Sequence, residues 1–442
     1  MSPLEGLPAE LRSLLLWNVP DLTTLRSLVH ASPVLHAQYC SDRDGILRAC
    51  LGRDMDGFFK DAWATAMSHV SALGSPRTNQ NITEFLNSTY DVVFKKPDPD
   101  ITSLSSGCLY SMVAFHTSVA GPLANLYARW ALANIAEAAS SSSVSVGPQA
   151  ASAAQTESSD LLNLSRSEEV RICRAIYRHE TFYNLFGRHA GRNDSTFATH
   201  EVLGLFFYNF DPWESEAIWC INVFLERAYE TIFDPIRHDI EACSPRLKQM
   251  TSRPGLEDVD EEPKDSAFTR APPLQLTDPA EVRSAARQLF ESSSSRTQPV
   301  EAAHDNTDVS MPSVLSQESS HSLRAYRRFD DPHAWWDPRE EAEERRDPVE
   351  FLGDDAASLA TDERKGPGSG PPIAWVRLWN GHHSNLYGEN VPPSPQRWGY
   401  VMWDARRWEE LGTLGLVAEQ WEAVPDVVEW IENMYNWSPT WD

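Results

Sequence analysis

Side chains able to do acid–base or metal chemistry are few in this chain and lie far apart. His382 and His383 are neighbours in a tryptophan-rich region, and His179 precedes Glu180 in a segment with helical periodicity. Neither pair has the His-Glu-x-x-His spacing that places two imidazoles on one helical face around zinc. The sequence contains no Gly-x-Ser-x-Gly elbow and no phosphate-binding loop. We therefore expect no catalytic, metal-ligating or cofactor-binding residues, and we predict that the protein is not an enzyme.

The cysteines are also widely spaced, with no Cys-x-x-Cys pair among Cys40, Cys50, Cys108, Cys173, Cys220 and Cys243. This spacing suits neither a disulfide scaffold nor a zinc site, so we expect reduced and mostly buried thiols. A hydrolase assembled from scattered histidines and carboxylates is kept only as a third hypothesis.

The strongest local pattern concerns apolar contact. The sequence LPAELRSLLL begins at Leu7. The sequence VPDL, which begins at Val19, interrupts this apolar segment, and further apolar residues continue to Val29. Short helices in so small a segment cannot bury every leucine against one another. Some of these side chains should therefore face the rest of the protein or a partner.

These letters resemble an F-box, the three-helix module that docks onto the Skp adaptor subunit of cullin-RING ubiquitin ligases. The resemblance covers the chain from Leu7 to about Tyr39, and it departs from many F-boxes in the third segment, which reads HASPVLHAQY from His30. Segments that begin at Leu164, Asp211 and Gln396 are similar to those of uncharacterised fungal F-box-like proteins.

The resemblance implies a non-enzymatic substrate adaptor of an SCF-type ubiquitin ligase. Its helices would dock a Skp-type subunit, while later regions bind an unknown target protein. The docking residues that it implies are Leu7, Pro8, Leu11, Leu15, Leu22, Leu25 and Val29. The alternative is a stand-alone helical structural or interaction protein, in which the N-terminal helices are only part of the core. An exposed apolar patch favours docking, whereas a patch covered by later helices favours the alternative.

Capping signals predict where these N-terminal helices begin and end. Pro8 suits the first position of a helix that Pro20 ends. Asp21 is a suitable N-cap for a second helix, and Ser32 followed by Pro33 predicts the start of a third.

Similar signals divide the rest of the chain. Ser165 and Glu168 have capping-box spacing, Gly187 should end that helix, and another helix should begin at Asp211. Residues 373–379 predict a strand, and residues 404–411 and 425–435 predict helices. We predict a mainly α fold with little β structure. The first half should comprise an F-box-like module (1–50), a helical region (51–138) and a disordered linker (139–160). The second half should comprise a helical domain (161–243), a disordered acidic Pro/Ser-rich linker (244–325) and a Trp-rich region that packs on the helical domain (326–442).

The sixteen tryptophans of the chain have two interpretations. Those in periodic segments should fill a small core, and these include Trp375, Trp379, Trp403 and Trp408. Those expected to be free for a partner are Trp335, Trp336, Trp437 and Trp441.

Composition narrows the classes of partner. The 442 residues carry a formal charge of −26, and a surface so acidic disfavours binding to nucleic acid or to an anionic membrane. No basic and apolar leader is visible, and no apolar run reaches the length that spans a bilayer. We therefore expect no nucleic-acid or membrane partner, and a location in the cytoplasm and/or nucleus.

Overall fold

The computed structural model describes residues 4–69, 73, 78–90, 99–141, 163–187, 197, 199–243, 338–354 and 368–439. The expected linkers, apart from residues 139–141, lie outside these described residues. Within them every regular element is a helix, and the only extended pairing is one antiparallel bridge between Pro348 and His382. The prediction of a mainly α fold is therefore confirmed.

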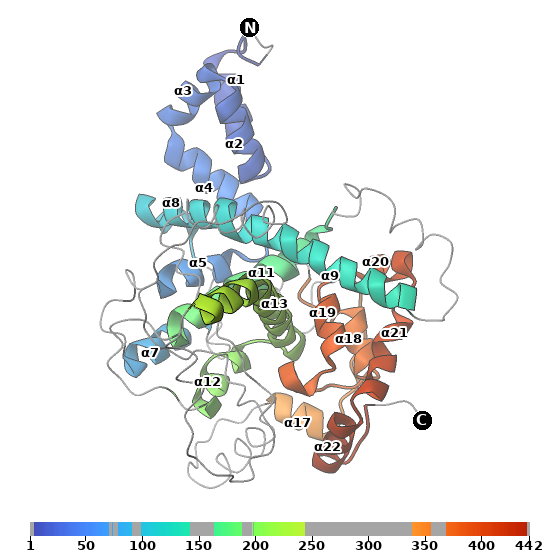
Figure 1. Cartoon of the computed structure of the whole chain (residues 1–442). Helices are drawn as coiled ribbons and strands as arrows, with labels where there is room; N and C mark the ends of the chain where they lie inside the picture. Colours follow the sequence, from blue (N-terminus) through green and yellow to red (C-terminus); the bar gives the residue numbers. More distant parts are fainter. Residues whose placement is uncertain are drawn as a thin grey trace.

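The N-terminal helices stand at one end of the molecule and project from the rest (Figure 1). They are α1 (Ala9–Trp17), α2 (Leu22–Ala31), α3 (Pro33–Ser41) and α4 (Arg43–Asp54). The helices that follow are α5 (Phe59–Ser68), α7 (Asn79–Tyr90), α8 (Ser106–Phe115) and α9 (Gly121–Ser141), with the 3-10 helix η1 (Ile101–Ser103) before α8 and the π-helix η2 (His116–Ala120) joining α8 to α9.

The middle of the chain supplies α11 (Arg166–Phe186), α12 (Thr199–Leu205), the 3-10 helix η4 (Phe207–Asn209) and α13 (Pro212–Cys243). The C-terminal region supplies α17 (Pro338–Glu344), α18 (Ile373–Leu378), η5 (Gly388–Asn390), α19 (Pro393–Trp398), α20 (Ala405–Leu411), α21 (Gly415–Glu419), η6 (Gln420–Ala423) and α22 (Pro425–Tyr435). α11 and α13 lie centrally, with the C-terminal helices gathered on one side of them (Figure 1).

Most of the expected helix starts are confirmed. The Asp21 carboxylate accepts the Thr24 N–H at 2.7 Å, and the Ser32 hydroxyl accepts the Leu35 N–H at 3.3 Å. Pro8, however, precedes α1 as its N-cap instead of occupying its first position. Its backbone is extended, with ψ at 150°, while its carbonyl already accepts the N–H groups of the first turn.

The capping box on α11 is also confirmed, since Ser165 and Glu168 exchange hydrogen bonds and the helix ends before Gly187. The prediction of a strand at residues 373–379 is wrong, because α18 occupies this segment. Its buried residues Ala374, Trp375 and Leu378, and the buried Trp379 that follows the helix, repeat at helical intervals. A short apolar run fits a buried strand as well as a buried helix, so periodicity alone did not separate the two.

Among the described residues, the larger of two hydrophobic clusters extends from the N-terminal helices through α9 and α11 to the C-terminal region. It includes Leu16 and Leu22 of the N-terminal helices, Tyr127 of α9, Val170 of α11 and Trp375 of α18. The tryptophans expected in the core are there, and the largest fully buried side chains are Trp375, Trp379, Trp403, Trp408 and Trp421. Trp437 was expected to be free but is buried, 6.1 Å from the Trp379 ring. Trp335, Trp336 and Trp441 lie outside the described residues.

Candidate docking surface

The exposed large apolar side chains of the described residues gather at the N-terminal end of the molecule. Leu11 (48% exposed), Leu14 (59%) and Trp17 (40%) follow one another on α1, and Leu4 and Val34 are also exposed. The remaining member of this group is Leu352, far along the chain. Single exposed leucines are ordinary, but several exposed apolar side chains at one end of a molecule are of the kind that marks an interaction site. We call Leu4, Leu11, Leu14, Trp17 and Val34 the α1–α3 face.

Three side-chain hydrogen bonds hold α1 parallel to α3. They link Ser32 to Glu5 (2.7 Å), Gln38 to Ser13 (2.7 Å) and Trp17 to Asp42 (3.1 Å), in the same chain order on both helices. Because the contact side of α1 carries Ser13 and the buried Leu16, its opposite side faces solvent. Leu11 and Leu14 are three residues apart and lie along that outer side, whereas Trp17, at the end of α1, is turned toward α3 and contacts Asp42.

Two consecutive residues at the end of α4 fix the turn between α1 and α2. Arg53 donates to the carbonyl oxygens of Trp17 and Val19, each at 2.7 Å from Nη2. Asp54 accepts the Leu22 N–H at 2.9 Å in a buried position. The guanidinium thus satisfies the end of one helix and the carboxylate the start of the next, as the polarity of helix termini requires.

The structure divides the expected docking residues into three groups. Pro8 and Leu11 are exposed, and Leu7, Leu15 and Val29 are partly buried. Leu22 and Leu25 are 2% and 3% exposed and belong to the core, so in this conformation they offer nothing to a partner. Their placement corrects the expectation, because α2 packs against α3 and α4 and both leucines belong to the hydrophobic core.

Leu14, Trp17 and Val34 were missed as candidates although the signal was present in the sequence. Leu14 lies three residues after Leu11, on the side of the helix opposite Leu16, and Trp17 is the last residue of the same helix. A helical projection of residues 9–17 would have found them.

A buried polar chain joins the N-terminal helices to the centre of the molecule. His116 in η2 has its Nε2 3.7 Å from Asp54 Oδ2 and its Nδ1 3.0 Å from the Tyr177 hydroxyl of α11. Burial lowers the pKa of His116, although Asp54 opposes that shift. These three side chains therefore connect the end of α4 to α11 through η2.

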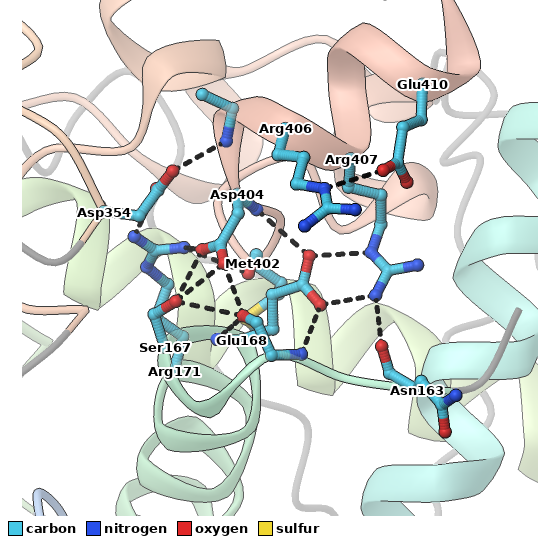
Figure 2. A network of polar contacts seen from close by, with 12 residues as sticks. Asn163, Ser167, Glu168, Arg171, Asp354, Met402, Asp404, Arg406, Arg407 and Glu410 are labelled. Atoms are coloured by element: carbon cyan, nitrogen blue, oxygen red, sulfur yellow. Dashed lines mark hydrogen bonds and ion pairs between the residues drawn. The ribbon is translucent and has the colours of Figure 1, made fainter.

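A second polar network lies in the interior between α11 and the C-terminal region (Figure 2). Arg171 pairs with Asp354 at 2.9 Å and with Asp404 at 2.7 Å, and Arg407 pairs with Glu168 at 2.6 Å. Burial raises the pKa of Asp354 even though Arg171 opposes the shift. Each of these carboxylates is held by an arginine, and the network joins segments more than 180 residues apart in sequence. The network is therefore a set of buried structural ion pairs that join α11 to the C-terminal region.

The same helix carries two more arginines one and two turns further along. Arg174 pairs with Glu214 at 2.9 Å, and Arg178 pairs with Asp61 at 2.9 Å. α11 is therefore joined to α5 and α13 by buried ion pairs.

The residues considered for acid–base or metal chemistry do not converge. His179 lies on α11, where its Nε2 is 3.4 Å from the Asn222 amide oxygen and burial lowers its pKa to about 4. His382 and His383 lie in the C-terminal region beside Trp437 and Trp375, respectively. Over the described ranges, no group of three or more His, Cys, Asp or Glu side chains is placed to hold a metal ion. Nor is any helix in these ranges long and apolar enough to cross a membrane.

The carboxyl of Glu216 is buried and accepts hydrogen bonds from uncharged groups. Glu216 of α13 is 0% exposed and accepts the Gly388 N–H at 2.7 Å and the Gln396 amide at 3.0 Å. Burial raises the pKa of Glu216 to about 8, while both hydrogen bonds oppose the shift. This contact holds η5 and α19 against α13.

Comparison with protein-family models, with curated proteins and with solved structures finds no match for this chain.

Proposed function

We propose that this protein is a non-enzymatic substrate adaptor of a cullin-RING ubiquitin ligase. In this proposal the α1–α3 face docks a Skp-type subunit, and later regions hold an unidentified target protein. The adaptor works in the cytoplasm and/or nucleus. The supporting features are the F-box-like letters from Leu7 and the short helices that they form, α1, α2 and α3.

The observation that carries the proposal is the position of the exposed apolar side chains. Five of the six large ones among the described residues are Leu4, Leu11, Leu14, Trp17 and Val34. Moving a large apolar side chain from full exposure to full burial is worth roughly 1.5–3 kcal/mol. These five residues are 36–59% exposed, so a partner that covers them gains a part of that free energy for each. An amphipathic helix that lies in an apolar groove is a common mode of recognition.

The proposed activity requires no catalytic side chain in this chain. An adaptor that binds both a ligase subunit and a target raises the effective concentration of the target lysine near the ubiquitin carrier. The buried ion pairs of α11 suit this role, because they join α11 to α5 and to the C-terminal region. The hydrophobic core that these elements share also includes the N-terminal helices, so the protein would hold target and ligase at a fixed separation.

A second function, a stand-alone helical structural or interaction protein, is favoured by one observation. Leu22 and Leu25 share their core with Trp375 and Trp403 of the C-terminal region, as expected if the N-terminal helices only complete a larger fold. The two functions differ in whether Leu11 and Leu14 contact a Skp-type subunit.

The test is co-elution of the full chain with a purified Skp-type subunit in size-exclusion chromatography. We expect a complex with the unmodified chain and its loss with the combined substitution Leu11→Ala and Leu14→Ala. Leu352→Ala is the matched control, since Leu352 is equally apolar and 52% exposed but lies outside the α1–α3 face. Circular dichroism checks that each variant is folded. Failure of the unmodified chain to form the complex contradicts the proposal and favours the stand-alone function.

A further inference from the structure

We propose that residues 388–399, which include η5 and α19, form a strap that lifts from α13 when the buried Glu216 carboxyl loses its proton. The strap is a conformational device of the C-terminal region, and the inference does not depend on the docking function proposed above. It rests on the two glycines that bound the strap and on the carboxyl that fastens it.

A glycine lies at each end of the strap. Gly388 and Gly399 have φ angles of +66° and +62°, in the left-handed region that favours glycine. Each also lies directly against a ring. A Cβ atom on Gly388 would be 3.0 Å from Trp219 Cδ2 of α13, and a Cβ atom on Gly399 would overlap the Tyr127 hydroxyl of α9. The strap therefore has two ends at which a hinge can absorb a change in φ and ψ, and it fits closely on two helices.

Glu216 fastens both parts of the strap to α13. Its Oε2 accepts the Gly388 N–H of η5 at 2.7 Å, and its Oε1 accepts the Gln396 amide of α19 at 3.0 Å. The same amide donates to the Gly388 carbonyl at 2.7 Å, so η5 and α19 are also joined to each other. Both donors to Glu216 are uncharged, and a neutral carboxyl keeps acceptor oxygens for them. The closed strap therefore needs no negative charge on Glu216.

No described side chain around Glu216 carries a balancing positive charge. The carboxyl is 0% exposed and, among the described residues, belongs to no ion pair. Its titratable neighbours are Cys220 of α13, Tyr127 of α9 and Tyr400, which follows the strap. Burial raises the pKa of all three, so they stay uncharged up to pH 8. An ionised Glu216 is thus a buried unpaired charge, and lifting the strap lets water solvate it.

A second carboxyl acts in the same direction. Burial and, to a lesser extent, Glu226 of α13 raise the pKa of Glu389 in η5 to about 7. Burial also raises the pKa of Glu226, and Arg227, which opposes this shift, is paired with Glu230 at 2.8 Å. When Glu389 and Glu226 are both ionised, they repel each other across the contact between η5 and α13. Protonation therefore favours the closed strap at both of these carboxyl contacts.

Apolar contacts keep the strap closed while Glu216 holds its proton. Val391 and Trp398 on the strap are 3% and 5% exposed. The chain on either side is anchored separately, because Tyr387 stacks on Phe207 with ring centroids 5.5 Å apart and Tyr400 is 0% exposed. The segment between these two tyrosines can therefore lift as a local unit.

The direction of the pH effect follows from the number of bound protons. In the open strap Glu216 is in water with its usual pKa of 4.5, whereas in the closed strap burial raises the pKa to about 8. Between these values the closed strap binds one more proton than the open strap. The stability of the closed strap is therefore complete below pH 4.5 and is lost as the pH rises to about 8. The equilibrium constant for opening should increase about tenfold for each pH unit in this range.

The experiment is hydrogen–deuterium exchange of the full chain at pH 5.5, 6.5 and 7.5, measured by mass spectrometry. Dividing the exchange rate of an unstructured chain at the same pH by the observed rate gives a protection factor. We expect the protection of strap peptides to fall about tenfold or more per pH unit and to be lower than that of α11 at every pH. Protection that does not change with pH overturns the proposal. A strap that is as protected as α11 also overturns it, because the strap would then open only when the whole protein unfolds.

Three substitutions of glutamate by glutamine identify the proton. Glu216→Gln keeps one acceptor oxygen but has no proton to lose, so the protection of its strap should fall about tenfold less per pH unit than in the unmodified chain. Glu389→Gln removes only the second carboxyl and should still lose about tenfold per pH unit. Glu230→Gln is the matched control, since Glu230 is exposed on the same helix, and it should keep the full pH dependence. An unchanged pH dependence in Glu216→Gln overturns the proposal.

Gly388→Ala tests the close fit of the strap on α13. The added methyl group would lie 3.0 Å from the Trp219 ring at a left-handed φ, so it should lower strap protection at all three pH values and leave the pH dependence in place. Unchanged protection would overturn the assignment of Gly388 as a hinge. Circular dichroism checks that each variant is folded. If Glu216→Gln does not fold, the pH dependence of the unmodified chain and of Glu389→Gln still decides between a strap that responds to Glu216 and one that does not.

Discussion

Asp54 and Leu22 are 32 residues apart, and the carboxylate of the first accepts the backbone N–H of the second at 2.9 Å in a buried position. The same oxygen of Asp54 lies 3.7 Å from Nε2 of His116. One side chain therefore completes the start of α2 and also connects the N-terminal helices to the rest of the core. The consequences can be measured.

Replacing Asp54 should destabilise the protein, because the buried backbone N–H of Leu22 loses its hydrogen-bond acceptor. Asp54→Ala leaves the Leu22 N–H buried without an acceptor, a defect that costs about 1–3 kcal/mol. Urea unfolding followed by circular dichroism measures the loss. Asp54→Asn preserves an acceptor oxygen and should lose clearly less, and equal losses in the two variants would show that the hydrogen bond to Leu22 is not the cause.

The junction at His116 should weaken in acid. Burial lowers the pKa of His116 below its usual 6.5, so the folded state holds the neutral imidazole while the unfolded state takes up a proton. The stability that this group contributes is present above pH 6.5 and is lost as the pH falls from there toward the folded pKa. His116→Asn removes the titration. Between pH 7 and pH 5 the variant should therefore lose less of its unfolding free energy than the unmodified protein, and parallel losses would contradict the assignment.

Glu216 should act in the opposite direction. Burial raises its pKa to about 8 from 4.5, so the folded state retains a proton that the unfolded state releases. The stability that this group contributes is present below pH 4.5 and is lost as the pH rises from there to about 8. Between pH 5 and pH 8 the loss due to Glu216 is about 3 kcal/mol. Glu216→Gln removes this component, so its urea midpoint should fall less than that of the unmodified protein over the same range; an identical fall would mean that Glu216 is ionised in the fold.

The buried ion pairs and the surface ion pairs should differ sharply in importance. Arg171→Ala leaves Asp354 and Asp404 as unpaired interior carboxylates, which costs about 3–5 kcal/mol. The matched control is Arg406→Ala, which breaks an exposed pair with Glu410 in the same view (Figure 2) and should change stability by less than about 1 kcal/mol. Thermal unfolding of the two variants measures both losses of stability. Similar losses would show that the buried pairs of Arg171 matter no more than the exposed pair of Arg406.

The sequence by itself determined the local structure. The caps at Asp21 and Ser32 and the capping box at Ser165 follow from hydrogen bonds that reach only three residues along the chain. The spacing of Leu11 and Leu14 likewise places them on one side of a helix whatever the rest of the protein does. Where a segment is short and apolar, as in α18, the sequence did not separate helix from strand.

Only the tertiary structure decided which apolar residues a partner can reach. Leu22 and Leu11 are both leucines of the N-terminal helices, but Leu22 is 2% exposed in the core and Leu11 is 48% exposed. The pairing of Arg171 with Asp404 also could not be predicted, because it joins side chains 233 residues apart. An ion pair of this kind depends on which helices pack together, and packing is set by the whole core and not by the neighbours of either residue.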